Sequence, residues 1–347
     1  MRASVLLVAL LIAARMAAQS LQSPQSYSIT HTFRLGGDGG WDYLVPDPPN
    51  HRLFIARQDR LMVVDMNDGH LIREIGGING AHGTALAPAT GHGFATSGND
   101  SSIVMFDLKT YQPLARIKAA EDADAIIYDP ASNRVLSFNG DANSSTVVDP
   151  RAGTVITNIP LPGKPESGES ARNGMIYVNL VDSSRIVEID AKKLIATKKV
   201  WSTGPCKSPV SMAIDTRHER LFSGCRSGVM AISDYRNGTV VATVPIGQGV
   251  DGAGYDPVLR DVYASNADGT LTVIHQDSPD KYHVVAILQT GERARNMGLD
   301  PATHRIYLAS AKFGPVPTDS TAGNPRRRPP MVPGSFTVIV VEPIGSH

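Results

Sequence analysis

Charged and polar residues recur about every 40 residues along this chain, each 12 positions before a residue in an apolar run. They are Asp42, His82, Asp124, Asp251 and Arg295, with Glu166 as the nearest equivalent between Asp124 and Asp251. Carboxylates with one imidazole can hold a divalent cation, or can transfer protons, if they meet in one place. Trp41 precedes Asp42 and could add an apolar wall. This chemistry requires a fold that brings the recurring positions together.

The segment from Gly40 to Gly77 is the unit that the chain repeats. It contains four apolar runs of strand length separated by Asp, Pro, Asn or Gly, at 43–46, 52–56, 61–66 and 70–75. The Asp that closes the third run recurs at intervals of 42, 42 and 41 residues, at Asp65, Asp107, Asp149 and Asp190. A four-stranded repeat of this length is typical of a β-propeller blade.

Six complete copies are followed by a last copy, from Glu292, that supplies only three strands. The segment from Tyr27 to Leu35 has the pattern of the missing fourth strand. We therefore predict an all-β, seven-bladed β-propeller of four-stranded antiparallel blades, closed by the N-terminal strand joining the last blade. Closure of this kind removes exposed sheet edges. A single propeller domain is expected over residues 27–343.

Residues 1–20 are typical of a signal peptide. Arg2 precedes an apolar core over 5–14, and Ala18-Gln19-Ser20 offers a cleavage site between small residues. The core is too short for a helix that spans a bilayer. We expect a monomeric periplasmic or secreted protein without a membrane span. Its 33 basic and 33 acidic residues leave no positive excess, which argues against nucleic acid as a partner.

The two cysteines, Cys206 and Cys225, fall at the start of the first strand and the end of the second strand of the fifth repeat. An antiparallel hairpin places these points at the same end, so an exported protein is expected to join them by a disulfide. Free thiols and soft metal ligands are the alternatives.

Several segments resemble the YVTN/YncE-like family of seven-bladed β-propellers, which are bacterial exported proteins. The resemblance is carried by residues 175–179, 221–226, 303–308 and 333–336, together with Gly163-Lys164-Pro165-Glu166, Pro205-Cys206 and Gly249-Val250-Asp251. It implies the fold and export, and it leaves the biochemical role open. That branch often carries a Glu near Ser208, and this chain departs from it there. Lactonases and quinoprotein dehydrogenases share the architecture, but their motifs are not matched here.

A propeller would bring the recurring positions to one mouth of its central channel, where three interpretations remain open. The polar groups could line a hydrated channel and satisfy turn amides. They could hold a divalent metal ion through Asp42, His82, Asp124, Glu166 and Asp251. They could form a metal-free acid/base site, with His82 as the base and Arg295 holding an anionic substrate. The fifth repeat places Val210 at this position, after Lys207 and Ser208.

The last repeat carries a proline- and arginine-rich insertion over residues 313–334 on the same predicted face. Such a loop is usually a cover, a binding loop or a disordered segment. If it covers the mouth, Arg326, Arg327 and Arg328 would face the acidic residues or an anionic ligand.

These features lead us to expect a protein that binds a small molecule or an envelope protein at the channel mouth. Trp41, Asp42, Asp124, Glu166, Asp251 and Arg327 would be the ligand-binding residues. The alternative is a metal-dependent hydrolase or lyase, resembling the lactonases, at the same site. The sequence has no Gly-x-Ser-x-Gly elbow, Walker A or Rossmann motif.

Overall fold

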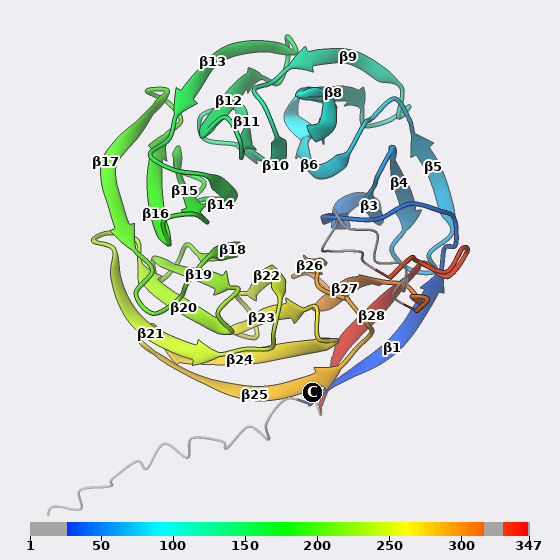
Figure 1. The fold of residues 1–347 in the computed structure, drawn as a ribbon, viewed down its shortest axis with the longest axis vertical. Helices are drawn as coiled ribbons and strands as arrows, with labels where there is room; N and C mark the ends of the chain where they lie inside the picture. The colour runs from blue at the N-terminus through cyan, green and yellow to red at the C-terminus, as the bar shows by residue number, and fades with distance from the viewer. Residues whose placement is uncertain (1–25, 316–328, 346–347) are drawn as a thin grey trace, which may run out of the picture.

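The computed structural model describes residues 26–315 and 329–345, which form seven four-stranded antiparallel sheets arranged around a central axis (Figure 1). The predicted seven-bladed propeller is therefore confirmed. Residues 1–20, which we predict to be a signal peptide, lie outside the described residues. No helix in the described part of the chain is long and apolar enough to cross a membrane.

Blades 1 to 6 each run outward from the axis in chain order. Blade 1 consists of Leu44–Asp47 (β2), Arg52–Arg57 (β3), Arg60–Asp65 (β4) and Leu71–Ile75 (β5). Blade 2 consists of Ala81–Ala87 (β6), His92–Ser97 (β7), Ser102–Asp107 (β8) and Pro113–Lys118 (β9). Blade 3 consists of Ala123–Asp129 (β10), Arg134–Asn139 (β11), Ser144–Asp149 (β12) and Thr154–Pro160 (β13). Blade 4 consists of Pro165–Ser170 (β14), Met175–Leu180 (β15), Arg185–Asp190 (β16) and Ile195–Ser202 (β17). Blade 5 consists of Pro209–Asp215 (β18), Arg220–Cys225 (β19), Val229–Asp234 (β20) and Thr239–Pro245 (β21). Blade 6 consists of Val250–Asp256 (β22), Asp261–Asn266 (β23), Thr270–Ser278 (β24) and Lys281–Gln289 (β25). Three short 3₁₀ turns complete the described elements: Pro48–Asn50 (η1), Pro88–Thr90 (η2) and Gly98–Asp100 (η3).

Blade 7 combines the two ends of the chain. Met297–Asp300 (β26), Arg305–Ser310 (β27) and Thr337–Ile344 (β28) are followed outward by Ser26–Arg34 (β1). β1 pairs antiparallel with β28 from Ser26 opposite Ile344 to Arg34 opposite Thr337. The N-terminal strand thus closes the ring as predicted, and the terminal strand β28 has a neighbour on both sides.

The recurring Asp residues hold the tight turns that follow the third strands. The carboxylate of Asp107 accepts hydrogen bonds from the backbone N–H groups of Lys109 and Thr110. Asp149 and Asp190 make the same pair of contacts in blades 3 and 4. A short carboxylate that caps turn amides in this way explains the periodicity of the sequence without any role in binding.

The core lies between neighbouring blades. Leu136 and Phe138 of blade 3 pack in one cluster with Ile176 and Val178 of blade 4, and all four are fully buried. Burying each such side chain contributes about 1.5–3 kcal/mol. The packing of blade 3 against blade 4 therefore fixes the two sheets whose innermost strands, β10 and β14, carry Asp124 and Glu166.

The insertion in blade 7 begins and ends as a short antiparallel ladder. Phe313 and Met331 form an isolated bridge, and the N–H of Gly314 donates to the carbonyl oxygen of Pro330 at 2.8 Å. Arg326, Arg327 and Arg328 lie outside the described residues.

Candidate functional site

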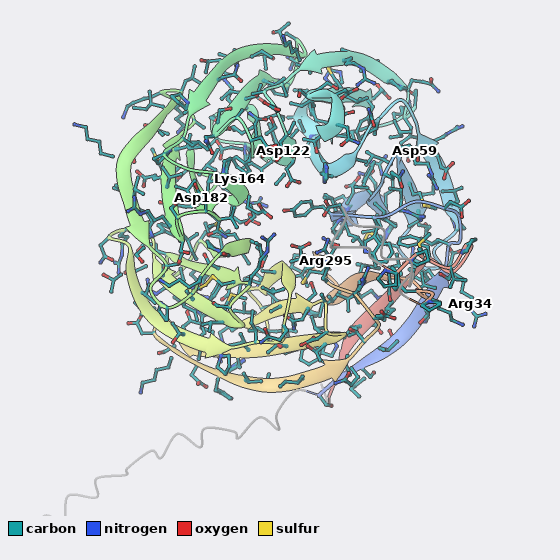
Figure 2. The ribbon with its side chains drawn as sticks, viewed as in Figure 1. Arg34, Asp59, Asp122, Lys164, Asp182 and Arg295 are labelled. Carbon is teal, nitrogen blue, oxygen red and sulfur yellow. A yellow bond between two sulfur atoms is a disulfide. The ribbon has the colours of Figure 1, made fainter. Side chains whose placement is uncertain are left out.

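The recurring polar residues sit at equivalent places in successive blades. His82, Asp124, Glu166 and Asp251 are the second residues of β6, β10, β14 and β22, and Asp42 lies two residues before β2. All five are half-buried. In blade 5 the equivalent position is the buried Val210, and in blade 7 Arg295 and Asn296 precede β26. Figure 2 shows Arg295 at the inner edge of the ring and Arg34 at its outer edge.

Contacts between these residues form one chain across the mouth of the channel. His82 Nδ1 lies 2.7 Å from Asp42 Oδ2 and 3.5 Å from Asp124 Oδ1. Asn296 Nδ2 donates to Asp42 Oδ1 at 3.0 Å and to Asp251 Oδ2 at 3.2 Å. Arg295 Nε lies 3.3 Å from the same oxygen of Asp251. We call these six residues the mouth network: Asp42, His82, Asp124, Asp251, Arg295 and Asn296.

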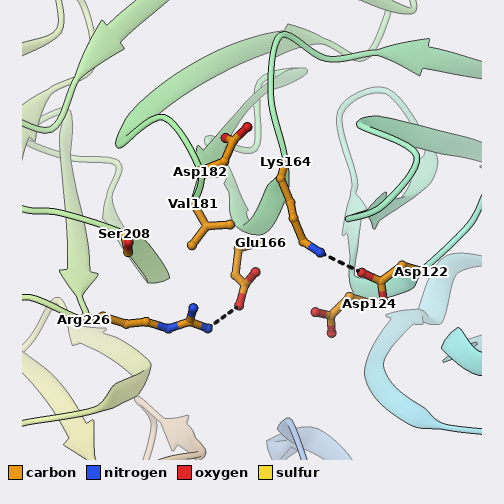
Figure 3. Close-up of a pocket in the computed structure, with 8 residues that line it drawn as sticks. All are labelled: Asp122, Asp124, Lys164, Glu166, Val181, Asp182, Ser208 and Arg226. Atoms are coloured by element: carbon orange, nitrogen blue, oxygen red, sulfur yellow. Dashed lines mark hydrogen bonds and ion pairs between the residues drawn. The ribbon is translucent and has the colours of Figure 1, made fainter. Parts of the chain in front are cut away.

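Glu166 stands apart from this network, beside a cavity of about 490 Å³ (Figure 3). Its Oε1 lies 3.4 Å from Nη2 of Arg226, which follows β19 of blade 5. On the other side of the cavity Lys164 Nζ contacts Asp122 at 3.3 Å and Asp141 at 2.6 Å. Blade 5, whose innermost strand offers only Val210, thus reaches the mouth through Arg226.

Burial and crowding change the acidity of the mouth residues. Burial is the main cause that raises the pKa of Asp124 well above its usual range, and the Asp42 carboxylate adds to it. Burial likewise raises the pKa of Glu166 to about 7 and that of Asp251 to about 6. The hydrogen bond to Asp42 raises the pKa of His82 to about 9. His82 is therefore protonated at neutral pH and cannot accept a proton in that state, which suits a proton donor better than the predicted base.

Tyr43 was not singled out in the sequence, yet it lies among the carboxylates. It belongs to blade 1 but packs against the apolar cluster shared by blades 3 and 4, so its side chain crosses the channel. Burial, and then Asp124, Asp42, Asp251 and Glu166 in that order, raise the pKa of its phenol well above its usual range. A neutral phenol in this place can donate or accept a hydrogen bond at the centre of the mouth.

Two oxygen atoms of the network are buried without a hydrogen-bond partner among the described residues: Asp124 Oδ1 and Asn296 Oδ1. Asn296 is 2% exposed, and its amide nitrogen already serves two carboxylates. Buried oxygens of this kind are rare because losing their hydration costs about 1–3 kcal/mol. Both therefore mark places where a hydrogen-bond donor, whether water or a ligand group, or a cation would lower the free energy.

Of the five predicted metal ligands, three converge. Asp42, His82 and Asp124 each offer one ligand atom, and these atoms lie within 4.8 Å of one another. Glu166 and Asp251 do not belong to this group. Two carboxylate oxygens and one imidazole nitrogen form a donor set that suits Mn²⁺, Zn²⁺ or Fe²⁺ once the ion displaces the proton of His82. Asp124 Oδ1, which accepts no hydrogen bond among the described residues, fits such an ion.

Trp41 lies beside the mouth network, held by aromatic neighbours. Its ring is 5.3 Å from Phe336 and 6.0 Å from Phe313, measured between ring centroids. Beneath it the fully buried Arg57 lies 3.7 Å over the Phe336 ring. Arg57 donates to the carbonyl oxygens of Gly36, Asp38, Gly39 and Gly40, which precede Trp41. Arg57, which has no distinguishing feature in the sequence, therefore holds in place the backbone segment that leads to Trp41 and Asp42.

The other predicted functional residues fall outside the mouth network. Cys206 and Cys225 are joined by a disulfide with a Cα–Cα distance of 5.4 Å, and both are fully buried in blade 5. Arg327 lies outside the described residues. Asn296, Arg226 and Tyr43 were not predicted as site residues, because they do not lie at the repeated position.

Comparison with known proteins gives the architecture and nothing more specific. No protein family model matches the chain, and no curated protein matches it. Among solved structures it is similar to a chain titled Kuenenia stuttgartiensis Hydrazine Synthase, with a TM-score of 0.67 and 15% sequence identity. The match covers 81% of this chain and 95% of that one. At this identity the likeness extends to the propeller fold alone.

Proposed function

We propose that this protein is an exported binding protein that holds a small ligand at the mouth of its channel, through a cationic or hydrogen-bond-donating group of that ligand. The observation that carries the proposal is the pair of buried oxygens without partners, Asp124 Oδ1 and Asn296 Oδ1, within a network of three carboxylates. These two oxygens differ from other buried polar atoms without a partner in that they stand beside the converging ligand atoms of Asp42, His82 and Asp124, where a donor or a cation can reach them.

The chemical character of the mouth favours a cationic group. Burial raises the pKa of Asp124, Glu166 and Asp251, and the nearby cations Arg226 and Arg295 only partly offset this for Glu166 and Asp251. A bound cation would supply further positive charge. For export, the support is the signal-like composition of residues 1–20 and the buried disulfide, which is stable in an oxidising compartment.

The test is a thermal-shift and calorimetric screen of small organic amines and divalent cations against the wild-type protein and Asp42→Asn/Asp124→Asn. A ligand that binds the folded state raises the melting temperature. We expect at least one probe to stabilise the wild type and not the double variant. The matched control is Asp59→Asn/Asp277→Asn, which removes two negative charges from exposed positions, 70% and 49% accessible, outside the mouth network. Equal responses of the two double variants would refute the proposal.

A second candidate, a metal-dependent hydrolase or lyase, is favoured by the convergence of Asp42, His82 and Asp124. These three residues would hold the ion, which would polarise a substrate carbonyl or lower the pKa of a bound water. His82 would have to lose its proton to bind the ion, so Tyr43 would then be the nearest proton donor. Elemental mass spectrometry of protein purified without chelator separates the two candidates. About one ion per chain, lost in Asp42→Asn/Asp124→Asn, would favour the hydrolase or lyase, and no ion would favour an organic ligand.

A further inference from the structure

A second cavity, of about 340 Å³, lies beside the mouth network between blades 7 and 1. Its lining includes Trp41, Phe313, Arg293, Arg295 and Asn296. It shares Arg295 and Asn296 with the network, but its chemistry is the opposite: aromatic rings and guanidinium groups in place of carboxylates. Cavities of this size commonly hold small molecules.

The apolar wall of this cavity is built from fixed rings. Trp41 is tilted by 46° against the fully buried Phe336 and by 44° against Phe313. Because Phe336 is fully buried in the core and its ring also contacts the buried Arg57, Trp41 has a rigid support. An indole held in this way offers a flat surface to an aromatic ring.

The positive charge of the cavity has little to neutralise it. The guanidinium of Arg293 lies 4.5 Å over the ring of Phe313. Within residues 26–315 and 329–345, the structure gives Arg293 no ion pair with a carboxylate. A guanidinium stacked on a ring keeps the N–H donors at its edge available for a planar anion.

Arg295 supplies a second guanidinium two residues further along. Its contact with Asp251 uses Nε at 3.3 Å, so its terminal nitrogens are not committed to that pair. The N–H of Arg295 donates to the carbonyl oxygen of Arg293 at 2.7 Å, which holds the two residues in a fixed tight turn. Two guanidinium groups beside one aromatic wall suit a carboxylate that is attached to a flat ring.

We propose that this cavity binds a small aromatic carboxylic acid, with its ring against Trp41 and its carboxylate on Arg293 and Arg295. The proposal rests on the proposed function insofar as it takes the channel mouth to be a ligand site. It deepens that function by naming the anionic and aromatic part of what is bound there.

The experiment measures binding of 4-fluorobenzoate to the full mature chain by ¹⁹F NMR, with benzoate, 1-naphthoate and indole-3-carboxylate as competitors. We expect Arg293→Gln to weaken binding by about tenfold or more, because a charge-assisted bidentate contact is lost. Arg293→Lys should restore only part of the affinity, since it keeps the charge without the planar fork. Trp41→Leu should also weaken binding.

The matched control is Arg260→Gln. Arg260 has nearly the same left-handed backbone as Arg293, with φ of 59° against 55°, and lies exposed in the turn between β22 and β23. The neutral analogue 4-fluorobenzamide should bind at least about tenfold more weakly than the acid. The inference fails if none of the four acids binds at millimolar concentration, if the amide binds as well as the acid, or if Arg293→Gln behaves like Arg260→Gln.

The variant Asp42→Asn/Asp124→Asn keeps this test separate from that of the proposed function. This double variant should no longer bind the cationic probes and should still bind 4-fluorobenzoate. Conversely, Arg293→Gln should lose binding of 4-fluorobenzoate and keep binding of the cationic probes. Both results are expected if the two sites bind their ligands independently.

Discussion

At the scale of single residues, the mouth of the channel is a place where charges are held in unfavourable surroundings. The raised pKa of Asp124, Glu166 and Asp251 and the two buried oxygens without partners describe the same condition. Asp42 has the closest ionic partner there, in His82 at 2.7 Å, whereas the ion pairs of Asp124, Glu166 and Asp251 are 3.3–3.5 Å long. Residues that pay such a cost in stability are typical of binding and catalytic sites.

This condition predicts the pH dependence of cation binding. Glu166 and Asp251, with pKa values of about 7 and about 6, are protonated at pH 5 and ionised at pH 8. His82, whose pKa Asp42 raises to about 9, stays protonated from pH 5 to pH 8 and so adds no pH dependence in this range. Affinity for a cationic probe should therefore rise by about tenfold or more from pH 5 to pH 8. Calorimetry at four pH values checks this, with Glu166→Gln expected to flatten the upper part of the curve. Affinity that falls or stays constant over this range would contradict the assignment.

At the scale of elements, the innermost strands place the polar residues, and the turns adapt the ring where a blade departs from the repeat. Blade 5 has Val210 at the repeated position and reaches Glu166 through Arg226 of the β19–β20 turn. Blade 1 departs further, because Asp42 precedes β2 and depends on the segment from Gly36 to Trp41. Arg57 of β3 holds that segment by its carbonyl oxygens.

Replacing Arg57 therefore tests how the element positions the site. Arg57→Met should lower the free energy of unfolding by roughly 3 kcal/mol, because several buried carbonyl groups lose their donor. The variant should also bind the cationic probes and 4-fluorobenzoate more weakly, because Asp42 and Trp41 directly follow the segment that Arg57 releases. Urea unfolding and the two binding assays measure these effects, with the exposed Arg34→Met as the control. If Arg57→Met is as stable as the control and binds both kinds of probe equally well, the segment from Gly36 to Trp41 keeps its conformation without Arg57.

At the scale of the whole molecule, the repeat made the fold and much of the mouth predictable from sequence. The same offset from a strand residue in successive blades identified Asp42, His82, Asp124 and Asp251, because equivalent positions in a closed ring must face one axis. Tyr43 could not be found this way, since its position depends on a side chain that crosses to blades 3 and 4. Arg57 and Asn296 were also missed, because their roles come from contacts between distant blades rather than from spacing.

The free energy of unfolding also shows whether the mouth carboxylates serve binding or serve only the stability of the fold. Asp124 offers the most direct test. Burial raises the pKa of Asp124 in the folded protein, so its ionised form is less favourable there than in the unfolded chain. The cost is present above the raised pKa and disappears as the pH falls toward the unfolded value of about 4. Asp124→Asn should consequently stabilise the protein at pH 8 and make little difference at pH 4.

The first measurement is thus urea unfolding of Asp124→Asn and Asp129→Asn at pH 8, two variants of the same strand β10. Asp129 is fully buried and accepts hydrogen bonds from Ser170 and from the backbone of Ser132, so its replacement should destabilise the blade. We predict that Asp124→Asn raises the free energy of unfolding by about 1 kcal/mol while it weakens cation binding, and that Asp129→Asn lowers the free energy. If Asp124→Asn lowers stability as Asp129→Asn does, the mouth carboxylates serve the fold, and the account of a ligand site built on them is contradicted.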